Sequence, residues 1–93
     1  MKTKNTSRAV EQLHLRENRY ARYYLLRIRI ERIRVYAIYI QRGEDVALEL
    51  IGSDERKAEE AFLKAETGEL SPQHLYDWAS DLREEEKREM ILC

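Results

Sequence analysis

Three runs rich in apolar residues, separated by short polar stretches, make up residues 23–51 and predict three β-strands. The pattern is interrupted at residues 31–32 and again at residues 42–45. Both interruptions have lengths that hairpin loops commonly have. We therefore predict an antiparallel β-meander with strands at about residues 23–30, 33–41 and 46–51.

The two loops also set the pairing of the strands, and the pairing decides which side chains share a face. A two-residue first turn places Ile28 opposite Val35, and a four-residue second loop places Tyr39 opposite Leu48. One face is then apolar or aromatic throughout, so we predict that helices cover it and that the two together form the core. The expected core residues are Tyr24, Leu26, Ile28, Val35, Ala37, Leu48, Leu50, Phe62, Leu75 and Trp78.

The opposite face combines apolar residues with arginines and tyrosines. An apolar surface of this kind often contacts protein, with Arg at the rim and Tyr nearer the centre. We predict an interaction face, and we also expect strand 23–30 to form a sheet edge that could extend across a dimer. The predicted face consists of Tyr23, Leu25, Arg27, Arg29, Arg34, Tyr36, Ile38, Ile40 and Glu49.

The period changes from two to helical after Gly52. Ser53 or Asp54 can cap a helix over about residues 54–67, in which Ala58, Ala61, Phe62 and Ala65 make an apolar stripe. A second start signal, with Ser71 as N-cap and Pro72 at the first helical position, predicts a helix over about residues 72–90. The predicted fold class is α+β, a three-stranded antiparallel β-meander with two C-terminal helices packed on one face, in one domain over residues 23–92.

Residues 1–22 leave two alternatives open. Val10, Leu13, Glu17 and Tyr20 recur at helical spacing, but one of the four is charged. The segment is therefore expected to be either a short helix or a disordered N-terminal arm.

Composition limits the class of protein. The chain has 93 residues, 43% of them hydrophobic, which suits one folded domain with a modest core. No stretch approaches the roughly 18 apolar residues that span a bilayer, so no membrane partner is expected. Cys93 is the only cysteine and forms no internal disulfide, so we expect a cytoplasmic protein.

Charge is segregated along the chain although the net charge is only −1. Residues 1–42 carry a net charge of +8 and residues 43–93 a net charge of −9. Such asymmetry fits nucleic-acid binding, acidic helices lying near a basic sheet, or two molecules pairing head to tail. The near-zero total favours charge pairing within or between copies of the chain.

Two further patterns resemble a family of small uncharacterised bacterial proteins. They are the tyrosine-rich strands, Tyr23-Tyr24-Leu25-Leu26 and Val35–Ile40, and the helix start Leu70-Ser71-Pro72-Gln73-His74-Leu75 with Asp77 and Asp81 downstream. Ala37 stands where that family has glycine, and Trp78 where it has an aliphatic residue. The resemblance covers about residues 23–82 and implies a bacterial, cytoplasmic source and no particular activity.

Residues that could carry chemistry are few. His74, Asp77 and Asp81 share one side of the second predicted helix, but three residues on one helix make an incomplete metal site. We predict that His74 forms a hydrogen bond near the helix start and that both aspartates are solvated. No catalytic, metal or cofactor site is predicted, and the chain is expected not to be an enzyme.

These observations favour a small regulatory or scaffold module that binds protein and associates with itself. The alternative is an accessory protein for RNA or single-stranded DNA, using Arg27, Arg29 and Arg34 for phosphates and Tyr36 for base stacking. Nucleic acid is the less favoured partner, because no recognised reading motif is present.

Overall fold

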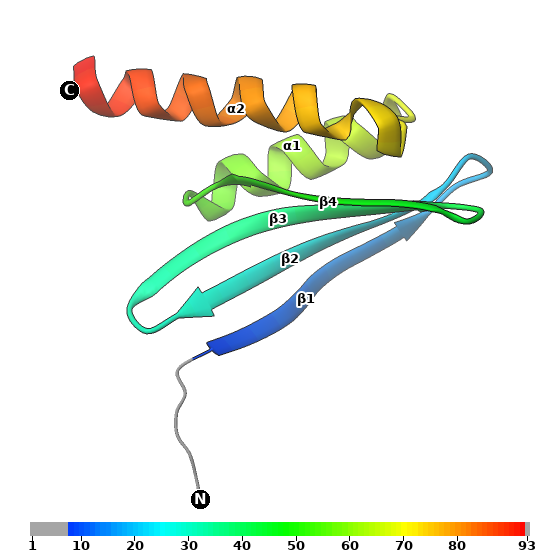
Figure 1. The fold of residues 1–93 in the computed structure, drawn as a ribbon, viewed down its shortest axis with the longest axis horizontal. Coiled ribbons are helices and arrows are strands. Elements are labelled where there is room, and N and C mark those ends of the chain that lie inside the picture. Colours follow the sequence, from blue (N-terminus) through cyan, green and yellow to red (C-terminus); the bar gives the residue numbers. More distant parts are fainter. Residues whose placement is uncertain (1–7, 93) are drawn as a thin grey trace, which may run out of the picture.

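The computed structural model describes the backbone of residues 8–92 and the side chains of residues 9–88. An antiparallel sheet carries both helices on one side (Figure 1). The α+β class is as predicted, but the sheet has four strands rather than three, in the order β1-β2-β3-β4. The elements are β1 (Arg8–Glu17), β2 (Arg22–Ile30), β3 (Ile33–Arg42), β4 (Asp45–Gly52), α1 (Glu55–Thr67) and α2 (Pro72–Leu92).

The predicted strand pairing is confirmed. Ile28 pairs with Val35 between β2 and β3, and Tyr39 pairs with Leu48 between β3 and β4. The first turn needs a positive φ, which Glu31 supplies at 57° although a residue with a Cβ rarely adopts it. The second loop is two residues shorter than predicted, because Arg42 and Asp45 already pair, and this change leaves the faces unaltered.

The prediction of a helix or disordered arm at residues 1–22 is wrong for Arg8–Glu17, which forms β1 beside β2. Residues 1–7 lie outside the described residues. A bulge explains the error: Gln12 pairs with Leu26 and His14 with Leu25, so Leu13 is an extra residue in the strand. A bulge breaks the two-residue period, and the apolar residues on either side of it then fall at helix-like spacing. Because β1 covers β2, the prediction that β2 forms a sheet edge is also wrong.

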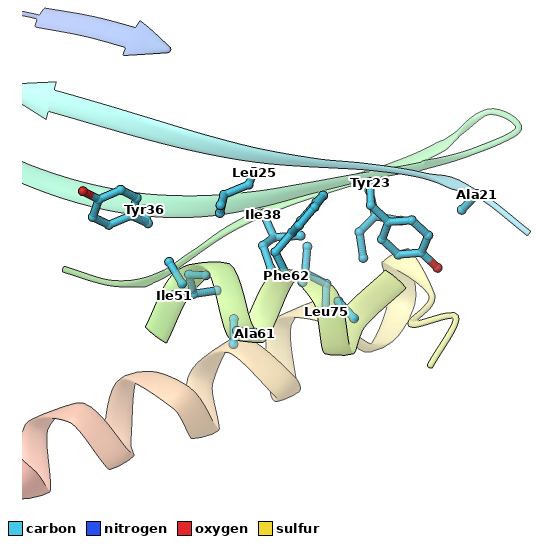
Figure 2. Packing of buried hydrophobic residues seen from close by; sticks show 13 residues of the cluster. Ala21, Tyr23, Leu25, Tyr36, Ile38, Ile51, Ala61, Phe62 and Leu75 are labelled. Atoms are coloured by element: carbon cyan, nitrogen blue, oxygen red, sulfur yellow. The ribbon is translucent and has the colours of Figure 1, made fainter. Parts of the chain in front are cut away.

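The prediction of which face the helices cover is wrong as well. The buried cluster lies between the helices and the face that carries Tyr23, Leu25 and Ile38, each 0% exposed (Figure 2). We call this the inner face of the sheet. Leu75 and Phe62 join the core as predicted, whereas Trp78 only packs against it, partly buried. The buried cluster comprises Ala21, Tyr23, Leu25, Tyr36, Ile38, Ile40, Ile51, Ala58, Ala61, Phe62, Ala65, Leu75 and Ala79.

The corner between β4 and α1 is held against α2. Tyr36 pairs with Gly52, which leaves Ile51 bulged and buried on the inner face. Gly52 has a φ of 148°, and a Cβ there would lie 2.6 Å from the Glu86 Oε1 atom. The Glu86 carboxylate accepts hydrogen bonds from the Ser53 amide at 3.1 Å and from the Ser53 hydroxyl at 3.0 Å. The positive φ favours glycine at this corner, and a Cβ would in addition force the end of the Glu86 side chain to move away from Ser53.

Burial of Tyr23 in the core makes the stability of the protein depend on pH in the alkaline range. Its hydroxyl donates to the Leu70 carbonyl at 2.9 Å, and burial raises the pKa of Tyr23 from 10.0 to about 12. Folding therefore favours the neutral phenol, and this contribution to stability is present below pH 10 and is lost as the pH rises towards 12. In urea unfolding between about pH 9 and 12, Tyr23→Phe should lose stability less steeply than wild type.

The matched control is Tyr76→Phe, which changes a tyrosine that is 60% exposed. It should keep the wild-type dependence on pH. If Tyr23→Phe and wild type lose stability equally over this range, the hydroxyl of Tyr23 is not buried.

Candidate interaction surface

The structure places most of the predicted interaction face inside the core. Five of its nine residues are buried, two are partly buried, and only Arg29 and Arg34 are exposed. The prediction that this face is open is therefore wrong, because α1 and α2 pack on it. The buried members are Tyr23, Leu25, Tyr36, Ile38 and Ile40, and the partly buried ones are Arg27 and Glu49.

Arg27 and Tyr36 are held in a polar network where the inner face meets the start of α1. Arg27 forms ion pairs with Glu11 of β1 at 2.9 Å and with Glu55 of α1 at 3.3 Å. The Tyr36 hydroxyl donates to the same Glu55 carboxylate at 3.0 Å. Burial, followed by the hydrogen bond to Glu55, raises the pKa of Tyr36. Arg27 and Tyr36 thus find their partners in the neighbouring strand β1 and in the covering helix α1.

Arg29 and Arg34 lie near the tip of the β2–β3 hairpin. They pair directly across the two strands, and both are exposed. Within the described part of the chain, no hydrogen bond or ion pair joins either guanidinium to another group. Of the predicted arginine patch, only these two remain free to meet an anion.

On the other side of the sheet the face is apolar at its centre, and no helix of residues 8–92 lies on it (Figure 1). We call it the outer face. Seven of its large apolar side chains are between 44% and 65% exposed. Its apolar members are Val10, Leu15, Tyr24, Leu26, Ile28, Ile30, Ile33, Val35, Ala37, Tyr39, Val46, Leu48 and Leu50, and the polar residues Gln12, Glu17, Arg22 and Gln41 share the face.

The sequence pattern had therefore found most of the outer face but assigned it to the core. Val10 and Leu15 were missed because they belong to β1, in which the bulge hides the strand period. On β2 and β3, Tyr24 and Tyr39 pair edge to face with their ring centroids 5.4 Å apart. An ion pair between Glu17 and Arg22, at 3.2 Å, lies at the end of the face. The surface is thus apolar at its centre and charged at this end.

Groups suited to catalysis do not converge in the described residues. Ser71 Oγ and His74 Nδ1 share a hydrogen bond of 2.8 Å at the start of α2, which confirms the predicted role of His74. Asp77 and Asp81 are exposed, as expected. Among the described residues, no group of three or more His, Cys, Asp and Glu side chains is arranged to hold a metal ion.

A cleft between the helices indicates no catalytic or ligand-binding site either. It has a volume of about 270 Å³ and lies between α1 and α2, with Trp78 and Leu82 beside Lys64 and Glu85. Its lining mixes apolar, basic and acidic side chains, so it points to no particular ligand. Neither helix, over the residues described, is long and apolar enough to cross a membrane.

Comparison with known proteins finds no matching family model, no matching curated protein and no matching solved structure. The family resemblance given by the sequence patterns stays a prediction. Of the features described, the outer face gives the strongest indication of a function.

Proposed function

We propose that this chain is a small, non-enzymatic, cytoplasmic regulatory or scaffold module that acts by binding protein through its outer face. The observation that carries the proposal is the exposure of a continuous apolar sheet face on a folded domain. Val10 and Ile33 are each 65% exposed, and Leu48 is 50% exposed. Monomeric proteins rarely leave contiguous apolar patches of more than a few hundred Å² in water, and larger patches mark sites of interaction.

The size of the face supports this function. The strands contain between eight and ten residues. At about 3.4 Å per residue and about 4.8 Å between strands, a four-stranded face measures about 30 by 19 Å. The whole face, polar positions included, thus covers about 570 Å², at the upper end of the roughly 300–600 Å² of the largest apolar patch on a typical monomer, a patch that often has a function.

The nucleic-acid alternative loses its support in the structure. The ring of Tyr36 is buried and only 3% exposed, so no base can stack on it. Arg27 is engaged by Glu11 and Glu55, which leaves only Arg29 and Arg34 for phosphates. Two arginines without an aromatic platform lack the combination that single-stranded nucleic acid requires.

The proposal predicts selective crosslinking from the outer face. A photoreactive phenylalanine analogue at Leu48, introduced into the full chain in its native cell, should give covalent adducts with protein. The same analogue at Leu63 of α1, which is 47% exposed against 50% for Leu48, is the matched control and should give few. Adducts are counted by mass spectrometry after irradiation. Equal yields at the two positions would overturn the proposal.

A further inference from the structure

We infer that the partner of the outer face is a second copy of this chain, so that two sheets pack face to face into a sandwich with the helices on the outside. The inference rests on the proposed function and names the partner for the same surface. Face-to-face sheets pack about 10 Å apart with interdigitating side chains, and they bury residues that alternate along each strand. The outer face has this alternation on β2, β3 and β4, and Val10 and Leu15 of β1 extend it on either side of the bulge.

The distribution of charge on the outer face fits a copy of itself better than a different partner. In a two-fold contact, residue i of one copy meets residue j of the other and j meets i, and only residues at the axis meet themselves, so a charge at the axis would meet a like charge. No Asp, Glu, Lys or Arg occupies an outer-face position from Tyr24 to Tyr39 or from Val46 to Leu50. The ion pair between Glu17 and Arg22 contains both signs and lies at the end of the face. A face without central charge offers a different protein no electrostatic complementarity.

The area is sufficient for a stable dimer. Two flat faces of about 570 Å² each would bury about 1,100 Å² in total. The uneven surface of the side chains would add to this area. A specific interface needs about 1,000 Å². The contact would also cover the exposed Leu48, Val46 and Ile33 side chains, whose exposure the single chain leaves unexplained.

The edges of the sheet are less suited to self-association than its face. At the β4 edge, Arg83 of α2 donates to the Leu50 carbonyl, and Gln73 donates to the Asp45 carboxylate at 3.2 Å. At the other edge, β1 carries the bulge at Leu13 and the charged residue Glu17. Bulges, charges and covering side chains all hinder the addition of another strand. Face packing is therefore favoured over extension of the sheet.

The inference predicts a dimer that one outer-face charge dissociates. By light scattering and sedimentation, the full chain should have twice the 11.2 kDa mass of one copy. Leu48→Asp should raise the Kd at least about a hundredfold, because it places an unpaired charge in a desolvated contact. Circular dichroism should show that this variant is folded. Leu63→Asp makes the same change on α1 and should remain dimeric.

A second measurement on the unaltered protein makes the test independent of the variants. Isotope-filtered NMR of mixed labelled and unlabelled chains should give contacts between copies from the methyl groups of Leu26, Ile28 and Leu48, and none from Leu63. Contacts from Leu63 alone, or a dimer that Leu63→Asp dissociates as readily as Leu48→Asp, would overturn the inference.

The failure of this inference can be told apart from the failure of the proposed function. A monomeric chain whose Leu48 crosslinks to a different protein would refute the sandwich and leave the protein-binding function standing. A monomeric chain without selective crosslinks at Leu48 would refute both.

Discussion

Ile38→Asp should abolish the folded state. Ile38 is 0% exposed in β3 and faces the helices across the inner face. A carboxylate at this position has no partner and must either stay charged or take up a proton in an apolar core. Such changes belong to the class that costs more than about 4 kcal/mol, against a total stability of about 5–15 kcal/mol for a typical domain. Far-UV circular dichroism and urea unfolding measure the loss.

The matched control is Leu48→Asp, on the neighbouring strand and the opposite face. Leu48 is 50% exposed, so the new carboxylate remains in water and the chain should stay folded. The pair tests the assignment of the two faces directly. If Leu48→Asp unfolds the protein while Ile38→Asp leaves it folded, the helices cover the outer face instead.

Phe62→Ala should be the most destabilising truncation in the helices, at about 3–5 kcal/mol. Phe62 is 1% exposed on α1, and its ring stacks with that of His14 at a centroid distance of 5.9 Å. Removing the ring leaves a cavity between the sheet and α1, and the neighbouring Ala58 and Ala61 are too small to fill it. The urea midpoint of unfolding should fall accordingly, while the slope of the unfolding free energy against urea concentration stays close to that of wild type.

Leu63→Ala is the control for Phe62→Ala, because Leu63 is the next residue of α1 and is 47% exposed. Its truncation removes a side chain that is already half in water, and it should cost less than about 1 kcal/mol. Equal losses for the two variants would mean that α1 presents a different side to the sheet.

Much of the secondary structure could be predicted from local pattern. A one-residue slip would exchange the two faces, so the side-chain pattern together with the two-residue turn sets the pairing of β2 with β3. The helices could be predicted equally well, because their start signals are short-range. The Asp54 side chain accepts a hydrogen bond from the Lys57 amide at 3.0 Å, and Pro72 begins α2. These features depend on neighbours in the sequence, so sequence analysis found them.

β1 could not be found in the same way. Its bulge at Leu13 removes the period, and its inner-face polar residues look unsuited to a strand packed on a core. In the fold they meet carboxylates of α1: Arg16 pairs with Glu66 at 3.1 Å, and His14 lies 3.3 Å from Glu59. Residues about fifty positions away in the chain make this segment compatible with the sheet.

The sequence by itself determined the helix boundaries, the register of β2, β3 and β4 and which residues of these three strands share a face, because these follow from side-chain period, turn length and local capping. Only the tertiary structure decided which face is buried. Both faces are apolar at their centres, so hydrophobicity alone does not separate them. The inner face is buried because its polar groups find partners there, Arg27 and Tyr36 at Glu55 and Tyr23 at the Leu70 carbonyl. No helix covers the outer face, which is apolar at its centre, and it is therefore the surface on which the proposed function depends.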